Sequence, residues 1–272
     1  MAGGLRAGNP AVMTCKALAV VALLALAACR QSGQSQATTV VDPIQIPPAV
    51  AAALADPGRA MHRAADARRR PGEIVAFTGV GPGDKVLDLI PGDGYWTRIF
   101  SRIVGPEGRV YAVWPVNYAR VAQGNVRSLR EIAASPAYAN VRVEVQPSTI
   151  LTAPEPLDLV FTAQNYHDYP DEFMGRTDPD QLNRAVSAML RPGGTWFIVD
   201  HAARPGSGMG ETERLHRIDP AEVRRQVEAA GFVYEGESRI LANPADDRTL
   251  PVFNPAVRGR TDQFVMRFRK PE

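Results

Sequence analysis

The amino-acid sequence predicts an α/β fold in which helices cover both faces of a mostly parallel sheet. Hydrophobic residues make up 45% and charged residues 22% of the 272 residues, a balance typical of a chain that buries a core. Short apolar segments that suit buried strands alternate with segments of helical periodicity along most of the chain. Pro and Gly, 23 of each, mark many short connections. We therefore expect a three-layer Rossmann-like sandwich with a seven-stranded sheet, whose last strand is antiparallel to the others.

The individual elements follow from apolar spacing and from breakers. Helices are predicted at 48–54, 59–70, 73–77, 95–104, 116–134, 179–190 and 220–230. Strands are predicted at 85–90, 109–113, 141–145, 157–161, 195–199, 232–241 and 261–269. The pattern reads as five strand–helix units followed by two strands, with a Pro- and Asn-rich excursion at 243–259 between the last two. In such a sheet a ligand is expected at the carboxyl ends of the parallel strands.

The N-terminal segment 1–28 has the pattern of an export signal. Arg6 and Lys16 supply positive charge, and 17–28 is an uncharged apolar run of about a dozen residues, too short to cross a bilayer. The run ends in Leu26-Ala27-Ala28-Cys29, which resembles the lipobox of bacterial lipoproteins, in which the cysteine carries lipid and begins the mature chain. An ordinary signal peptide, with Cys29 incidental, is the alternative.

This pattern predicts a lipoprotein exported to the periplasmic face of a bacterial membrane and held there by its lipid. Residues 29–46 begin with a Gln-, Ser- and Thr-rich stretch and are expected to form a flexible tether. Residues 47–272 are expected to form one domain. The Arg-rich stretch 59–70 is interpreted as a solvated helix face, or as a contact with anionic lipid.

Composition narrows the partners and the chemistry. The net charge is +2, so the strong basic excess of a nucleic-acid-binding protein is lacking. Both cysteines, Cys15 and Cys29, lie in the N-terminal segment. The predicted domain therefore has no disulfide framework, no cysteine zinc site and no thiol nucleophile.

Three segments carry a family resemblance. They are Asp88-Leu-Ile-Pro-Gly-Asp-Gly94 followed by Tyr95-Trp96-Thr97, then Leu157-Asp-Leu-Val-Phe161, then Leu190-Arg-Pro-Gly-Gly194 with the strand after it. In this order and spacing they resemble the motifs of class I S-adenosylmethionine-dependent methyltransferases over about 71–270. The chain looks closest to a group of predicted exported bacterial methyltransferases with unassigned substrates. The domain at 47–272 is thus expected to be methyltransferase-like.

The first segment must turn sharply from a strand into a helix and leave its backbone open to a ligand. Gly92 and Gly94 permit positive φ and close approach, and the helix from Tyr95 directs free N–H groups toward the ligand. The resemblance implies S-adenosylmethionine as cofactor, with its methionine part over the glycines and its amino group anchored by Asp88. The cofactor-binding residues expected are Asp88, Pro91, Gly92, Gly94, Tyr95, Trp114, Ser148 and Gln164.

Three positions depart from the family pattern. Ile90 stands where the family usually has a glycine, and its branched side chain narrows the approach to the ligand. Trp114 stands at the end of the second strand, where many members have an acid for the ribose hydroxyls, so its ring would stack instead. Ser148 follows the third strand, where an acid near adenine is common, and would make a single hydrogen bond.

Candidate residues for chemistry follow the fourth and fifth strands. His167-Asp168 and Asp200-His201 come after strand ends, and His216 lies in a later loop. A neutral histidine with an orienting carboxylate can take a proton from a hydroxyl or amine that accepts a methyl group. We expect His167, Asp168 and His201 to be catalytic, although each histidine also suits a loop cap. The same residues have metal-ligand chemistry, but without H-x-x-x-H or H-E-x-x-H spacing no metal site is predicted.

Two functions follow. The first is a methyltransferase that uses S-adenosylmethionine on a small molecule, and the intact Gly92-Asp93-Gly94 turn favours it. The second is a non-catalytic, ligand-binding lipoprotein that retains the fold. Export favours the second, because S-adenosylmethionine is made in the cytoplasm, and fold alone does not decide between them.

Overall fold

A computed structural model of the chain describes residues 45–272. The predicted signal peptide, Cys29 and most of the predicted tether lie outside the described residues. Within them, every helix is too short or too polar to cross a membrane.

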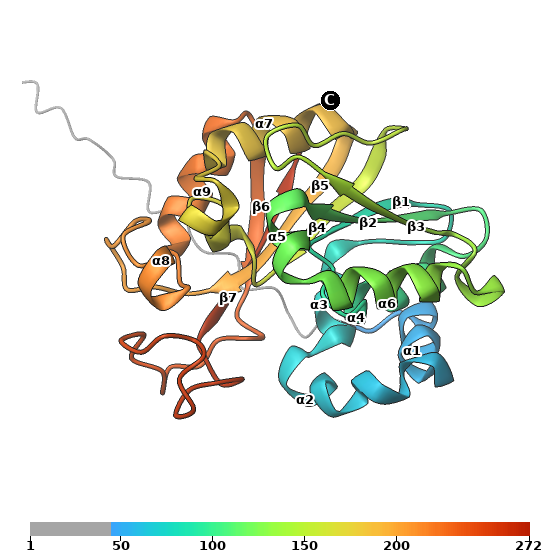
Figure 1. Cartoon of the computed structure of the whole chain (residues 1–272), viewed down its shortest axis with the longest axis horizontal. Coiled ribbons are helices and arrows are strands. Elements are labelled where there is room, and N and C mark those ends of the chain that lie inside the picture. Colours follow the sequence, from blue (N-terminus) through green and yellow to red (C-terminus); the bar gives the residue numbers. More distant parts are fainter. Residues whose placement is uncertain (1–44) are drawn as a thin grey trace, which may run out of the picture. The chain divides into compact units, whose positions relative to one another are not determined.

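The elements follow one another in the predicted alternation (Figure 1). The strands are β1 (Lys85–Leu89), β2 (Arg109–Pro115), β3 (Val141–Gln146), β4 (Leu157–Ala163), β5 (Leu190–His201), β6 (Val233–Ser238) and β7 (Gln263–Arg269). The α-helices are α1 (Pro48–Ala55), α2 (Asp66–Arg69), α3 (Pro71–Thr78), α4 (Tyr95–Val104), α5 (Val116–Val121), α6 (Gln123–Ala133), α7 (Pro179–Met189), α8 (Thr212–Leu215) and α9 (Pro220–Ala229). Short 3₁₀ helices are η1 (Pro57–Ala65), η2 (Pro136–Tyr138), η3 (Tyr166–Asp168) and η4 (Glu172–Met174).

The seven strands form one sheet in the order β3-β2-β1-β4-β5-β7-β6. Neighbours among β1 to β5 run parallel, whereas β7 runs antiparallel to both β5 and β6. The predicted seven-stranded, mostly parallel sheet with an antiparallel last strand is confirmed. The order reverses between β1 and β4, where chain connections leave toward opposite sides and a crevice opens at the carboxyl ends.

Both faces of the sheet are buried, because successive strand residues pack into different cores. In β5, Trp196 and Ile198 pack with α7 and α9, whereas Phe197 and Val199 pack with α1, α3 and α4. Figure 1 shows these two groups of helices on opposite sides of the sheet. This alternation is the period-two rule of a strand inside a three-layer sandwich.

Two of the helices begin at an Asp-Pro pair. The side chain of Asp178 accepts a hydrogen bond from the backbone N–H of Asp180, and Asp219 does the same for Ala221. Each pair places a capping carboxylate at the N-cap and proline at the first helical position, where no N–H is needed. The predicted starts of α7 and α9 are therefore confirmed.

Three predictions of local structure are wrong in detail. Residues 59–70 do not form one solvated helix: η1 and α2 share the stretch, and the buried guanidinium of Arg59 pairs with Asp66 at 2.8 Å. The helix predicted at 116–134 divides at Ala122 into α5 and α6. The fold has four strand–helix units rather than five, because 147–156, which contains three prolines, connects β3 to β4 without a helix.

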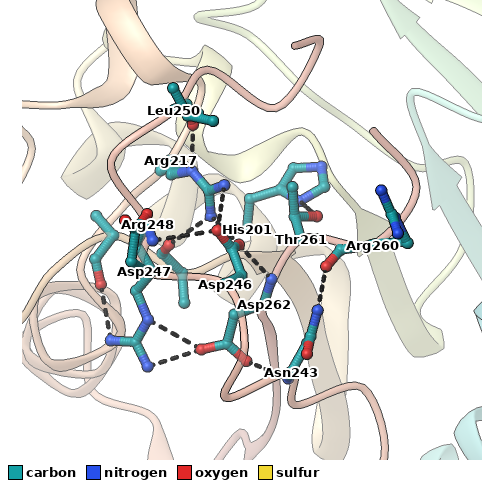
Figure 2. Close-up of polar contacts among 12 residues, drawn as sticks. His201, Arg217, Asn243, Asp246, Asp247, Arg248, Leu250, Arg260, Thr261 and Asp262 are labelled. Carbon is teal, nitrogen blue, oxygen red and sulfur yellow. Dashed lines mark hydrogen bonds and ion pairs between the residues drawn. The ribbon is translucent and has the colours of Figure 1, made fainter. Parts of the chain in front are cut away.

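A buried ion pair fixes the excursion at 243–259, between β6 and β7, to the rest of the domain (Figure 2). The guanidinium of Arg217 is fully buried and donates to both carboxylate oxygens of Asp246, at 2.8 and 3.2 Å. It also donates to the carbonyls of Leu250 and Ala202. Asp246 in turn accepts from the backbone N–H groups of Asp262 and Arg248. One side chain therefore ties a segment without helix or strand to the end of β5.

We expect Arg217→Met to destabilise the domain by about 3–5 kcal/mol, because it leaves the carboxylate of Asp246 buried without its partner. Urea denaturation followed by circular dichroism measures the change. Arg225→Met is the matched control: Arg225 is exposed where it pairs with Glu222, so the loss of stability should be much smaller. Equal effects of the two substitutions would contradict a central role for the buried pair.

Candidate functional site

A cavity of about 530 Å³ opens at the carboxyl ends of β1, β2, β4 and β5. Parallel strands end at the same edge of the sheet, so the loops that follow them meet there. The loop after β1 forms one wall of the cavity and the end of β2 another. The loops after β4 and β5 bring histidines to its remaining side.

The loop from β1 to α4 has three residues with left-handed backbone: Ile90 (φ 57°), Gly92 (φ 60°) and Gly94 (φ 82°). Ile90 keeps this conformation although it is β-branched, and its N–H donates to the carbonyl of Val113 at 2.9 Å. A Cβ at Gly92 would meet open space, so the backbone there is free for a ligand. The loop thus has the open shape that the sequence predicted.

Gly94 has the positive φ that the sequence predicted, and the close packing that it permits is within the domain. It does not line the cavity, and a Cβ there would come within 2.7 Å of the Leu129 side chain rather than near a ligand. Its positive φ and this close packing under α6 both require glycine.

Asp88 also lies outside the cavity lining. Its carboxylate is buried, accepts a hydrogen bond from the hydroxyl of Thr97 at 2.6 Å and accepts another from the Thr97 backbone N–H. Burial raises the pKa of Asp88 to about 7, against the opposing effect of these bonds. The contacts make Asp88 a cap for the first turn of α4. Ser148 is likewise outside the cavity, and its hydroxyl accepts a hydrogen bond from Thr177 at 2.9 Å.

The other expected cofactor residues do line the cavity: Pro91, Gly92, Tyr95, Trp114 and Gln164. Trp114 is fully buried at the end of β2, and its indole N–H finds no acceptor among residues 45–272. A buried donor without a partner is costly and is commonly satisfied by a ligand or water. Gln164, with φ 67°, donates to Gln263 of β7 at 3.1 Å.

Arg69 is a cavity residue that the sequence analysis did not single out. Its guanidinium lies 4.6 Å from the centre of the Tyr95 ring, and it forms no ion pair within the described part of the chain. Burial lowers the pKa of Arg69 from its ordinary value. Its neighbours in the sequence, Arg68 and Arg70, are exposed, so nothing in the run of three arginines indicates which one faces the cavity.

The histidines meet around two carboxylates. Asp200, fully buried at the end of β5, accepts a hydrogen bond from the His167 backbone N–H at 2.8 Å and pairs with His167 Nδ1 at 2.7 Å. His167 Nε2 lies 3.2 Å from Asp168 Oδ1, and His216 Nδ1 lies 3.7 Å from the same oxygen. The His201 ring is 6.0 Å from that of His167, and its Nδ1 is 2.8 Å from the Thr261 hydroxyl.

The pKa values of His167 and His201 are shifted in opposite directions. Burial opposes protonation of His167, but the charges of Asp200 and Asp168 outweigh it and raise the His167 pKa well above 6.5. Burial dominates at His201 and lowers its pKa to about 3. At neutral pH and without other ligands, His167 is therefore an imidazolium, whereas His201 is neutral.

No protein-family model matches the chain. The ubiquinone/menaquinone biosynthesis C-methyltransferase UbiE of Teredinibacter turnerae is 27% identical over 180 residues, which are 65% of this chain and 67% of that protein. The protein of the same name from Pasteurella multocida is 30% identical over 128 residues, which are 46% of this chain and only 43% of that protein.

Among solved structures, an S-adenosylmethionine-dependent methyltransferase from Aquifex aeolicus superposes with a TM-score of 0.53 at 19% identity, over 83% of this chain and 99% of that one. The fold is that of class I S-adenosylmethionine-dependent methyltransferases.

The cavity of this methyltransferase fold has the groups that an adenosyl amino acid needs. Gly92 has open space above its backbone. Within residues 45–272, the Trp114 indole N–H and the Arg69 Nε have no hydrogen-bond partner. Ile90 lines the same cavity and takes up space where a glycine would leave more. The residues present therefore fit such a ligand.

We expect the pH dependence of stability to report on Asp88. Its pKa is higher in the folded state than in the unfolded state, so the folded chain holds more protons between pH 4 and pH 7. The contribution of Asp88 to stability is therefore progressively lost as pH rises through this window. Asp88→Asn keeps an acceptor for Thr97 and never ionises. Thermal unfolding should show this variant gaining stability relative to wild type from pH 4 to pH 8. Parallel curves over that range would disprove the raised pKa.

Proposed function

We propose that the domain is a methyltransferase that transfers a methyl group from S-adenosylmethionine to a small molecule. The observation that carries this proposal is the cavity at the carboxyl ends of β1 and β2, which is open above Gly92. It is bordered by the Trp114 indole N–H and the Arg69 Nε, neither of which has a hydrogen-bond partner among residues 45–272. The UbiE relatives and the fold support the same reaction class.

In this proposal the cofactor lies across the ends of β1 and β2. Gly92 faces its methionine part, Arg69 pairs with its carboxylate, and Trp114 lies beside its ribose. Arg69 suits the carboxylate because a guanidinium offers two parallel donors to it. The bound cofactor supplies an electrophilic methyl group on a sulfonium, so the protein mainly has to align an acceptor with it.

The acceptor lies on the histidine side of the cavity. His201 is neutral there and accepts or donates a single hydrogen bond, which orients a hydroxyl or amine. Tyr118, Phe173 and Phe253 line the same cavity and favour an apolar or aromatic acceptor. The excursion covers this side, since Phe253 packs on the His216 ring with centres 4.9 Å apart.

The proposed location is the periplasmic face of a bacterial membrane, with the domain tethered by lipid on Cys29. The support is the sequence of 1–29 alone: a charged start, a short apolar run and a lipobox-like end.

Arg69→Met should weaken binding of S-adenosylhomocysteine by roughly 10-fold or more, because a charge-assisted pair is worth about 1.5–3 kcal/mol. The same variant should bind 5′-methylthioadenosine as wild type does, since that nucleoside lacks the amino-acid carboxylate. Isothermal titration calorimetry measures both ligands.

Arg68→Met is the matched control, because Arg68 is exposed and does not line the cavity. If the two substitutions had equal effects, or if both ligands lost affinity together, Arg69 would not recognise the carboxylate. If wild type bound neither ligand at millimolar concentration, the non-catalytic lipoprotein would become the better explanation.

Cys29→Ala should move the protein from the membrane fraction to the soluble fraction, because the lipid is the proposed anchor. Fractionation of cells, with mass spectrometry of the N-terminal peptide, measures the change. Cys15→Ala is the control and should stay in the membrane fraction, since Cys15 precedes the apolar run. An unprocessed N-terminus in cells would end the proposal.

A further inference from the structure

We propose that His167, Asp168 and His216 bind one divalent transition-metal cation at the side of the cavity. Each of the three offers one ligand atom, and these atoms all lie within 4.8 Å of one another. Two histidines and one carboxylate form a ligand set that suits zinc and other first-row divalent metals.

The distances between the three ligand atoms suit a shared ion. Asp168 Oδ1 lies 3.2 Å from His167 Nε2 and 3.7 Å from His216 Nδ1. Metal–ligand bonds of about 2.0–2.2 Å place adjacent ligand atoms roughly 3–3.6 Å apart. Small side-chain adjustments therefore suffice to bring all three atoms onto one cation.

The surroundings of His167 are a second, independent observation. Its Nδ1 is taken by the carboxylate of Asp200 at 2.7 Å, so Nε2 is the ring nitrogen left to face Asp168. A histidine that binds metal through one nitrogen usually gives the other to a carboxylate, which orients the ring and raises its basicity. Asp168 is held as well, since Asn165 Nδ2 donates to its second oxygen at 3.2 Å.

His216 reaches the cluster from a distant part of the sequence. It follows α8 with left-handed backbone, φ 54°, a conformation that a residue other than glycine rarely adopts. The next residue, Arg217, is fully buried and paired with Asp246, which fixes the chain at this point. Strained backbone held by its surroundings is common at ligand sites, so the placement of His216 agrees with a role as ligand.

The site has an open side. All three residues line the cavity, and the His216 side chain is 27% exposed, which leaves a route for an ion to enter. Sites with three protein ligands and a free position are the catalytic rather than the structural kind. The three residues line the same cavity in which the proposed function places the methyl acceptor. Metal binding itself does not depend on that function.

A metal-free explanation predicts a different result. In it, protonated His167 bridges Asp200 and Asp168 as a buried ion-pair cluster, and His216 is only a neighbour. The two explanations differ in whether a cation binds stoichiometrically and in whether His216 contributes to its affinity.

The test is titration of the full chain, stripped with a chelator, with Zn²⁺ and with Co²⁺ in the absence of any adenosyl ligand. We expect one ion per chain, a visible absorption band from bound Co²⁺, and at least 10-fold weaker binding in His216→Ala. Asp200→Asn, a change at a positioning residue, should weaken binding by 10- to 100-fold. His62→Gln, at a histidine that belongs neither to the proposed ligand set nor to the cavity lining, should bind as wild type does.

Circular dichroism checks that each variant is folded. His216 is partly exposed, so its substitution is the one best tolerated by the fold. Absence of stoichiometric binding in the wild type would overturn the proposal, as would unchanged affinity in folded His216→Ala. Because S-adenosylhomocysteine binding is measured separately, failure of the metal site and failure of the methyltransferase proposal are distinguishable.

Discussion

The carboxylate of Asp200 organises the functional edge of this sheet. It is fully buried at the end of β5, accepts hydrogen bonds from the backbone N–H groups of His167 and His201, and pairs with the His167 ring. A buried carboxylate is tolerated only when such partners surround it. The loops after β4 and β5 are consequently held together, and the histidines they carry are placed at the cavity. The fully buried Asp200 carboxylate therefore orients the His167 side chain at the cavity.

A second buried pair completes the cavity from the far end of the chain. Arg217 and Asp246 hold the excursion so that Phe253 packs on His216 and Thr261 meets His201. The excursion has turns with their own backbone hydrogen bonds but no helix or strand, so side-chain bonds add to what holds it in place. The same pair fixes the residue that follows His216. The Arg217–Asp246 pair therefore stabilises the excursion and also fixes the position of His216.

The cofactor side shows how a motif tolerates substitution. Ile90 takes the left-handed backbone that a glycine would adopt more readily, because its N–H is held by Val113 and its side chain is buried. Trp114 replaces an acid with a ring and an indole donor that lacks a partner among residues 45–272. Arg69, from the segment before the sheet, adds a cation that the motif itself does not contain. Under the proposed function, part of the ligand recognition therefore comes from α2, before the sheet, as well as from the strand ends.

The sequence by itself determined the class of fold, the succession of strands along the chain and the first residues of α4, α7 and α9. These depend on local signals: apolar runs of strand length, Asp-Pro caps, and glycines in the turn after β1. It also indicated that His167, Asp168 and His201 follow strand ends, since parallel strands end at one edge.

Tertiary structure alone decided which polar groups face the cavity. Asp88 and Ser148 have the right chemistry and the right strands, yet neighbouring hydroxyls occupy them, whereas Arg69 faces inward from a run of three arginines. His216 joins His167 although 48 residues separate them, so no short motif could indicate the proposed metal ligands. Local sequence sets backbone conformation over a few residues, but the contacts of a side chain depend on packing between distant segments.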